Sequence, residues 1–312
     1  MKKNQKKWLG LVFASLIVFT AACLGVQPPN QSVSQQGQET TTETSSENNQ
    51  GTNAMELAYN PPKMEGLEGK DDPLSESIKR GYTYVNESDT ALDQYVGNKL
   101  SCTSCHAGAG VGEASSLVGV TAVSPEYNPR AGKVMSIEDR INGCMVRSMN
   151  GEKLPLDSQE LRDMVSYLQY ISTGVPIGAD MPWRKPNTMK VEDLPETDLA
   201  QGEEIYKKSC IACHGADGEG IGANTGPAVW GEHSFNDGAG MARLSTATMF
   251  IQRNMPVGQE GSLTLEEAAN VAAYILSHER PKWKGREIDW PTGGAPKDSP
   301  YYDELKSVKE GL

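Results

Sequence analysis

The chain has 312 residues, of which 37% are hydrophobic and 6% aromatic, and its formal net charge is −12. This length leaves room for two small domains and tails. The acidic balance argues against a nucleic-acid partner, because binding of nucleic acid requires clustered Lys and Arg. The 32 glycines and 18 prolines predict long irregular loops between the secondary-structure elements.

The first 22 residues are predicted to be a secretory signal (1–22), because lysines precede a largely apolar run that ends in small residues. The ending Thr20-Ala-Ala-Cys23 resembles the lipobox of bacterial lipoproteins, although Thr20 stands where leucine is commoner. Cys23 is therefore the predicted lipid anchor; an ordinary signal peptide or an uncleaved anchor is the alternative. Residues 23–54 are mostly polar and predict a lipid-anchored tether. The predicted location is extracytoplasmic, as a bacterial membrane-anchored lipoprotein on the outer face of the cell membrane or in the periplasm.

The remaining sequence predicts one module that is used twice. Each copy begins with a helix, over residues 73–86 and 198–208, and each of these helices contains a glycine followed four residues later by a larger side chain. A Cys-x-x-Cys-His motif and a long Gly-rich stretch come next. Each copy closes with a helix, over residues 158–172 and 264–278, that opens with a Ser or Thr capping candidate.

The two cysteine motifs carry the strongest chemical signal. They read Cys102-Thr-Ser-Cys105-His106 and Cys210-Ile-Ala-Cys213-His214. Cys-x-x-Cys-His is the attachment signature of c-type haem, in which both thiols bond to the porphyrin and the adjacent imidazole ligates the iron. A zinc site would need four gathered ligands at spacings that these segments lack, and no βαβ pattern supports a thioredoxin-like pair. The predicted cofactors are therefore two covalently attached haem c groups, with His106 and His214 as iron ligands.

The predicted fold class is mainly α, with two tandem mono-haem cytochrome c-like domains and long Gly/Pro-rich loops. An opening helix, a haem motif, a looped segment and a closing helix together resemble the mono-haem cytochrome c fold. The predicted cytochrome c domains span residues 55–186 and 187–290. Residues 291–312 are predicted to be a polar C-terminal tail.

The far axial ligand of the second haem is predicted to be a methionine just before the closing helix. Met255 stands in that position, and Met241 and Met249 compete with it. Met249 is expected to pack on a helix beside apolar neighbours, so Met255 is favoured.

The first haem has two candidates for its far ligand. Met149 lies in a segment that aligns with the one around Met255, and spacing favours it. Cys144 is left without a partner after the anchor and the two motifs are accounted for. A free cysteine is more often a small buried hydrophobe than a ligand, so spacing alone gives Met149 the edge over Cys144.

A further helix, over residues 136–150, gives Cys144 a distinctive setting. Its predicted cap is Ser136, and a predicted core stripe consists of Ile137, Ile141, Met145 and Met149. An adjacent row at helical spacing consists of Arg140, Cys144, Arg147 and Ser148. Two guanidiniums beside a thiol predict an acidic thiol and an anion site. On pattern alone, an ordinary solvated face is an equally good interpretation.

With these residues in view, the chain resembles the di-haem, tetrathionate-forming thiosulfate dehydrogenase family of c-type cytochromes, over about residues 55–290. The most specific element is residues 140–151, Arg-Ile-Asn-Gly-Cys-Met-Val-Arg-Ser-Met-Asn-Gly. The resemblance implies that Cys144 ligates the first, catalytic haem opposite His106, and that Met255 ligates the second, electron-transfer haem. The catalytic and substrate-holding residues that it implies are Cys144, Arg130, Arg140, Arg147 and Ser148.

The activity implied by the resemblance is oxidative coupling of two thiosulfates to tetrathionate. Electrons would leave through the second haem to an external acceptor such as a cytochrome c or a terminal oxidase, and the same site could act in reverse as a tetrathionate reductase. One alternative is a membrane-tethered di-haem electron shuttle without substrate chemistry, which requires neither Cys144 nor the arginine row. Another is a cytochrome subunit of a sulfur-oxidation complex, in which a cysteine-ligated haem also occurs. A peroxidase is less well supported, because it requires an open haem site and a catalytic acid.

Overall fold

The computed structural model describes residues 57–310, which belong to one compact unit of the chain. The predicted signal, Cys23 and the tether lie outside the described residues. Within residues 57–310 no helix is long and apolar enough to cross a membrane.

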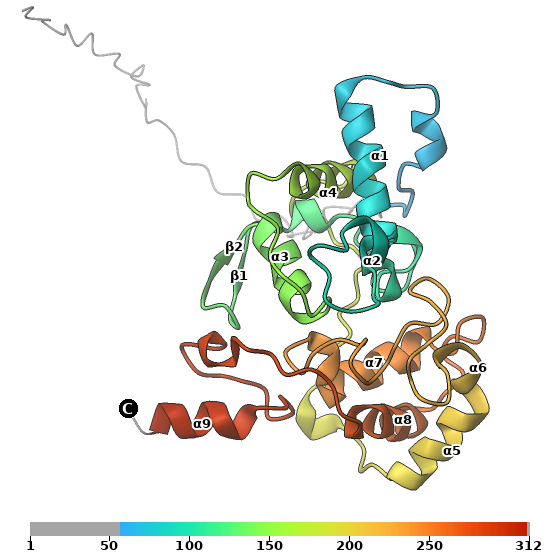
Figure 1. Cartoon of the computed structure of the whole chain (residues 1–312), viewed down its shortest axis with the longest axis vertical. Helices are drawn as coiled ribbons and strands as arrows, with labels where there is room; N and C mark the ends of the chain where they lie inside the picture. Colours follow the sequence, from blue (N-terminus) through green and yellow to red (C-terminus); the bar gives the residue numbers. More distant parts are fainter. Residues whose placement is uncertain (1–56, 311–312) are drawn as a thin grey trace, which may run out of the picture. The chain divides into compact units, whose positions relative to one another are not determined.

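Helices make up nearly all of the regular structure in the described residues, as the predicted fold class requires (Figure 1). The α-helices are α1 (Pro73–Asn86), α2 (Ser88–Ala91), α3 (Ile137–Arg147), α4 (Gln159–Ile171), α5 (Leu199–Ser209), α6 (Ile211–His214), α7 (Leu244–Asn254), α8 (Leu265–Ser277) and α9 (Tyr302–Glu310). Short 3-10 turns are η1 (Met64–Leu67), η2 (Cys102–Ser104), η3 (Gly108–Gly110), η4 (Val120–Ala122), η5 (Val191–Asp193), η6 (Gly240–Ala242) and η7 (Arg286–Ile288). Two strands, β1 (Glu126–Asn128) and β2 (Lys133–Met135), pair antiparallel.

The opening and closing helices of the first module cross at a glycine. A Cβ on Gly81 of α1 would lie 2.0 Å from the backbone oxygen of Asp163 in α4, so only glycine permits this approach. The crossing is further held by the buried Asp163 carboxylate, which accepts a hydrogen bond from Nε of Arg80 at 2.7 Å.

The second module repeats this crossing with α5 and α8. A Cβ on Gly202 would lie 2.1 Å from the backbone oxygen of Asn270. The predicted repeat of a glycine in each opening helix is therefore a repeat of one packing contact, in which two helix backbones touch.

Capping side chains set the helix boundaries close to those predicted from the sequence. The hydroxyls of Ser136, Ser158 and Thr264 accept hydrogen bonds from the third backbone N–H of α3, α4 and α8. Each cap satisfies a backbone donor that has no partner inside the helix. The predicted helix over residues 136–150 ends earlier, at Arg147.

The strands form a short hairpin whose turn carries Arg130. Asn128 pairs with Lys133 across the hairpin, and its backbone and side-chain oxygens accept bonds from Gly132 and Ala131. A Cβ on Gly132 would lie 2.4 Å from Pro291, so the turn packs directly on the C-terminal part of the chain.

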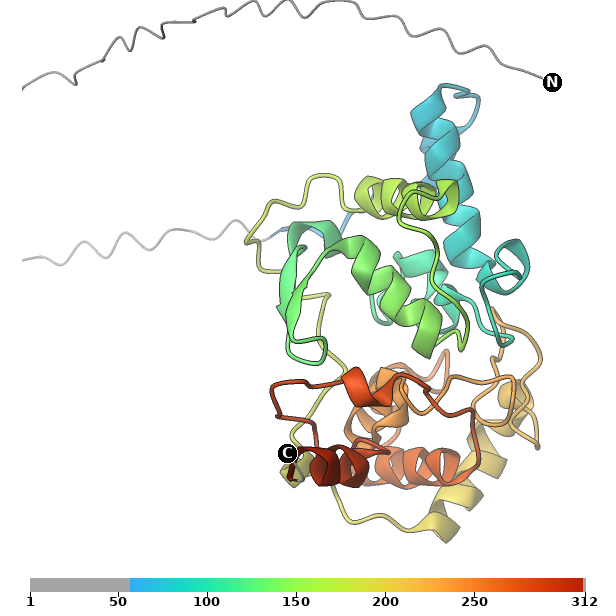
Figure 2. The ribbon, with the colours of Figure 1, turned by 60° about the vertical axis from the view of Figure 1, so that its left-hand side comes forward.

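The segment that follows α8 folds back across the first module. Residues 283–301, called here the C-terminal strap, contain η7 and run between α3 and the helices of the second module (Figures 1 and 2). Trp290, Tyr301 and Leu305 of α9 form a buried apolar cluster, with exposed fractions of 5%, 1% and 6%. The predicted polar tail therefore contains buried aromatic and aliphatic residues in its described part.

The two modules also share contacts outside the strap. Asn98 donates to the backbone oxygen of Ser148 at 2.8 Å and to that of Ser234 at 3.0 Å. Phe235 of the second module is buried in the same apolar cluster as residues of α1, α3 and α4. These contacts hold the end of α3 against the second module.

Candidate functional site

Helix α3 presents the predicted row of polar side chains on one face. The adjacent face is the predicted core stripe: Ile137, Ile141, Met145 and Met149 are buried, with exposed fractions of 1% to 9%. Arg140 and Cys144 are exposed, and Arg147 and Ser148 are partly buried. Residues four apart lie one above the other on a helix, so Cys144 is flanked by Arg140 and Ser148.

The two candidates for the first haem's far ligand differ in accessibility. The Cys144 side chain is exposed, whereas Met149 is 3% exposed and packs in the apolar core beside Leu100 and Leu154. Met149 also lies beyond the end of α3, and its N–H donates to the backbone oxygen of Cys144 at 3.0 Å. Cys144 is therefore the candidate whose side chain is available for coordination.

Cys144 lies close to the first haem-attachment motif. Burial raises the pKa of Cys102 to about 11 and that of Cys105 to about 12. Repulsion by a thiolate at Cys144 adds to both shifts. The three sulfurs thus share one region of the first module, with His106 next in sequence.

The expected acidity of Cys144 needs correction. Although the Cys144 side chain reaches solvent, desolvation by the protein around its sulfur raises the pKa of the thiol above its ordinary value, and this effect outweighs the lowering by Arg140 and Arg147. The helical pattern correctly predicted that the two arginines lower the pKa of the thiol, but it did not show the surrounding residues that desolvate the sulfur. Without a bound metal ion, this thiol is therefore not a ready thiolate.

Both motif histidines have the orientation that an iron ligand needs. Nδ1 of His106 lies 2.6 Å from the backbone oxygen of Ser115, and Nδ1 of His214 lies 2.8 Å from that of Pro227. Donation from Nδ1–H to a carbonyl leaves the Nε2 lone pair free for a metal. Burial lowers the pKa of both imidazoles, which keeps them in the neutral, ligating form.

A cavity of about 600 Å³ lies beside the second motif. Its lining includes Cys210, Cys213, His214 and Met255, together with mostly apolar side chains. Met241 also lines the cavity, whereas Met249 does not. Thiols, an imidazole and a thioether around an apolar cavity are the donor set and surroundings of a covalently bound His/Met haem, so these residues fit the cofactor.

The wall of this cavity also includes residues of the first motif. Thr103, Ser104 and Cys105 contribute to it, and Ser104 donates from its hydroxyl to the backbone oxygen of Ala223 at 2.8 Å. The attachment loop of the first site is therefore in contact with the second site.

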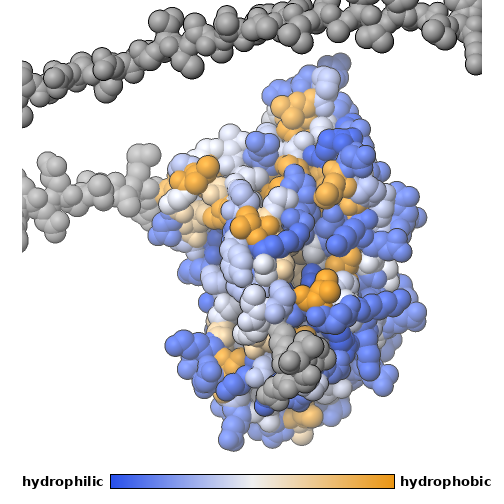
Figure 3. All heavy atoms as spheres, turned by 90° about the vertical axis from the view of Figure 1, so that its left-hand side faces the viewer, coloured by the Kyte–Doolittle hydropathy of each residue, from blue (hydrophilic) through white to orange (hydrophobic). Residues whose placement is uncertain are grey.

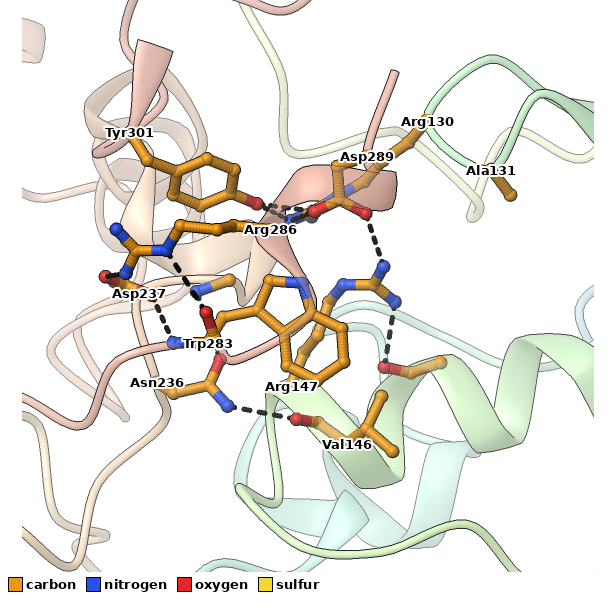
Figure 4. Close-up of polar contacts among 12 residues, drawn as sticks. Arg130, Ala131, Val146, Arg147, Asn236, Asp237, Trp283, Arg286, Asp289 and Tyr301 are labelled. Atoms are coloured by element: carbon orange, nitrogen blue, oxygen red, sulfur yellow. Dashed lines mark hydrogen bonds and ion pairs between the residues drawn. The ribbon is translucent and has the colours of Figure 1, made fainter. Parts of the chain in front are cut away.

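The three predicted substrate arginines have different partners. The guanidinium of Arg140 makes no hydrogen bond or ion pair with any residue in the range 57–310. Arg147 and Arg130 both bind the buried carboxylate of Asp289 in the C-terminal strap (Figure 4). The site thus combines one unpaired guanidinium on α3 with two that are held by a shared anion.

The sequence interpretation missed another basic residue near the first site. Arg184 lowers the pKa of His106 by electrostatic repulsion, and Arg140 has the same effect on the pKa of Arg184. Trp183, which precedes Arg184, holds both residues against the first module by donating from Nε1 to the backbone oxygen of Val118 at 3.0 Å. Trp183, near the end of the predicted domain 55–186, was the signal that this stretch packs on the first module.

Two models of known domains match the chain. Residues 93–177 match the SoxA/TsdA cytochrome c domain, and residues 199–279 match the cytochrome c domain. The described structure thus consists of two cytochrome c domains in tandem, as predicted.

Whole-chain relatives extend this likeness over both modules. The chain is 43% identical to a thiosulfate dehydrogenase of Allochromatium vinosum over 68% of this chain and 81% of that protein. It is 40% identical to a thiosulfate dehydrogenase of Psychrobacter arcticus over 73% of this chain and 71% of that protein. A solved structure of thiosulfate dehydrogenase (TsdBA) from Marichromatium purpuratum matches with a TM-score of 0.67 and 32% identity. That match covers 77% of this chain and only 54% of the other, longer chain.

Proposed function

Because the chain belongs to the thiosulfate dehydrogenase family, we propose that it oxidatively couples two thiosulfate ions to tetrathionate at its first haem site. The single observation that carries this proposal is the face of α3. An accessible Cys144, an unpaired Arg140 and the partly buried Arg147 lie there close to the first haem-attachment motif. An electron shuttle would require none of the three.

The residues described above would hold the haems. Cys102 and Cys105 would attach the first, with His106 and Cys144 as its iron ligands, and Cys210 and Cys213 would attach the second, with His214 and Met255 as its ligands. When bound, the haems supply the one-electron acceptors that take up the two electrons released in the reaction.

The arginines act on the charge of the substrate. Two dianions must approach each other and one sulfur, and their mutual repulsion opposes this approach. Arg130, Arg140 and Arg147 stabilise the paired anions, because fixed guanidinium forks match the oxygen atoms of oxyanions. The Ser148 hydroxyl, at the end of α3, offers one further donor to the same oxygens.

Cys144 provides the sulfur at which the two ions are joined. A bond forms between its thiolate sulfur and the sulfane sulfur of one thiosulfate, with loss of two electrons. The second thiosulfate then attacks that sulfane sulfur, tetrathionate leaves, and Cys144 is released as a thiolate. Each step conserves atoms and charge, and run backwards the same steps reduce tetrathionate.

Electrons leave through the second module. Thr103, Ser104 and Cys105 of the first motif line the cavity that would hold the second haem, so electrons would pass between adjoining sites. A thiolate ligand favours a lower haem potential than a thioether does, which would direct electrons from the first site to the second. On the face drawn in Figure 3, hydrophilic side chains predominate and apolar ones are scattered, as suits brief docking of a cytochrome or oxidase acceptor.

The sequence-based boundaries remain proposals alongside this function. We retain 1–22 as the secretory signal, 23–54 as a tether lipid-anchored at Cys23, and 55–186 and 187–290 as the two haem domains. This arrangement holds the enzyme at the outer face of the cell membrane or in the periplasm, where haem c proteins and their acceptors meet.

Thiosulfate oxidation and tetrathionate reduction by the purified holoprotein test the proposal. Reduction of both haems on addition of thiosulfate, with tetrathionate formed at half the rate of thiosulfate loss, is the expected result. Reduction by quinol-linked complexes with no response to thiosulfate would instead identify an electron shuttle. Turnover that appears only with added partner proteins would identify a subunit of a sulfur-oxidation complex.

Replacement of Met255 by leucine is expected to affect the second haem alone. The loss of a thioether ligand should abolish the near-infrared band of methionine ligation and lower the potential of that haem by roughly 0.1 V or more. Thiosulfate should still reduce the first haem, while electron delivery to an external acceptor slows. Met241→Leu is the control, because Met241 lines the same cavity; loss of the band in that variant instead would assign the ligand to Met241.

A further inference from the structure

Two of the proposed substrate arginines come from separate elements of the first module. Arg130 lies in the turn between β1 and β2, and Arg147 is the last residue of α3. No hydrogen bond or ion pair joins the two side chains directly in the part of the chain that the structure describes. Their relative position therefore depends on a third group.

That third group is the carboxylate of Asp289 in the C-terminal strap. Oδ1 accepts a hydrogen bond from Nη2 of Arg147 at 2.6 Å, and Oδ2 accepts bonds from Nη2 and Nε of Arg130 at 2.8 and 3.0 Å (Figure 4). Asp289 is 1% exposed, so these charge-assisted bonds are shielded from solvent.

Aromatic side chains fix the same guanidiniums. The guanidinium of Arg130 lies 4.7 Å from the ring of Trp290, and that of Arg147 lies 4.8 Å from the ring of Trp283. The hydroxyl of Tyr301 donates to Oδ2 of Asp289 at 2.6 Å and also contacts Arg130. Each arginine is thus held by a carboxylate at one edge and an indole against its plane.

The strap is itself tied to the rest of the protein. Its residue Arg286 pairs with Asp237 at 2.6 Å and with Glu304 of α9 at 2.7 Å. The N–H of Trp290 donates to the backbone oxygen of Arg130 at 2.7 Å, which fixes the hairpin turn. Asp289 therefore has a defined position relative to both arginines before any ligand arrives.

We infer that Asp289 is a positioning residue, which holds Arg130 and Arg147 in the orientation that binds the oxyanion of the substrate. This inference rests on the proposed function for the identity of that oxyanion. The residue acts through the arginines: its carboxylate occupies one edge of each guanidinium, and the remaining N–H groups are directed by that contact.

A substitution that removes the charge of Asp289 tests the inference, because simple attraction and positioning predict opposite changes in substrate affinity. Asp289→Asn adds one positive charge to the site, so simple attraction would tighten the binding of a dianion. Loss of positioning would weaken binding in spite of that added charge. A carboxylate that merely competes with the substrate for the arginines would also give tighter binding when it is removed.

We therefore expect Asp289→Asn to raise KM for thiosulfate about tenfold while kcat changes by less than about threefold. Tyr301→Phe, which keeps the charge and removes one hydroxyl, should raise KM by a smaller factor of about three. An unchanged or lower KM in Asp289→Asn would overturn the inference.

Asp163→Asn is the matched control. Asp163 of α4 is also buried, with 0% exposure, and also accepts a bond from an arginine Nε, at 2.7 Å, but its partner is Arg80 of α1. We expect this variant to lose stability with KM unchanged. An equal rise of KM in both variants would show that the effect is general destabilisation and would overturn the inference.

A second readout needs no turnover. Thiosulfate should raise the melting temperature of the wild-type holoprotein, because a ligand that binds the native state stabilises it, and Asp289→Asn should lose this shift. If thiosulfate shifts the melting temperature of the wild type but not that of Asp289→Asn, and the wild type does not oxidise thiosulfate, the positioning role stands and the proposed function fails. If the wild type turns over thiosulfate but Asp289→Asn retains both KM and the thermal shift, the inference fails and the function stands. Absence of a thermal shift in the wild type would also overturn the inference.

Discussion

Replacement of Cys144 by serine is expected to lower thiosulfate-dependent reduction of the haems at least about a thousandfold. Serine retains the size of the side chain but provides neither a sulfur that can bond to thiosulfate nor a thiolate ligand. The two Cys-x-x-Cys-His motifs are untouched, so both haems should remain attached. The measurement is stopped-flow haem reduction by thiosulfate, with haem content determined in the same samples.

Met149→Leu is the control for this substitution. Leucine retains the volume of a side chain that is 3% exposed in the apolar core, so both activity and spectra should be preserved. Activity retained in Cys144→Ser would exclude the covalent role of this cysteine. If wild-type protein shows methionine-ligation bands for both ferric haems, and Met149→Leu loses one of them, then Met149 rather than Cys144 binds the first iron.

Much of the fold follows from local sequence signals. Ser136, Ser158 and Thr264 predicted three helix starts because capping depends on residues within one helical turn. The glycines of the two opening helices predicted a repeat, and the structure gives its cause in the contacts of Gly81 and Gly202 with facing backbones.

The faces of α3 were predicted for the same local reason. Helical spacing separates Ile141 and Met145 from Arg140 and Cys144, whatever the helix packs against. Spacing alone favoured Met149 over Cys144, because spacing does not include accessibility, which depends on the rest of the fold. The predicted direction of the Cys144 pKa shift was wrong for the same reason, because desolvation of the sulfur depends on the tertiary structure around it.

The C-terminal strap was beyond local prediction. Asp289 meets Arg147 and Arg130 across 142 and 159 positions of the chain, in a segment whose Pro, Gly and charged residues are typical of an exposed tail. Its aromatic residues were the available signal, since Trp283, Trp290 and Tyr301 are costly to expose. Composition does not show which carboxylate pairs with which arginine.

Replacement of Arg140 by glutamine is expected to give the second large loss, of about a hundredfold in kcat/KM for thiosulfate. Arg147 and Arg130 share the negative charge of Asp289, whereas the guanidinium of Arg140 has no hydrogen-bonded or ionic partner among residues 57–310. Its whole charge is therefore available to a dianion beside Cys144. Removing it takes away stabilisation that no neighbouring group replaces.

Two comparisons separate this local effect from a change in net charge. Arg162→Gln removes the same charge from an exposed position on α4 and should leave kcat/KM within about twofold, because distant surface charges are screened. Arg140→Lys keeps the charge but loses the planar fork, so it should recover only part of the activity. Steady-state rates of these variants at two ionic strengths separate the local effect from the effect of net charge. Equal losses for Arg140→Gln and Arg162→Gln would mean that long-range attraction, rather than contact with the substrate, accounts for the role of Arg140, and the α3 face would then no longer distinguish an enzyme from an electron carrier.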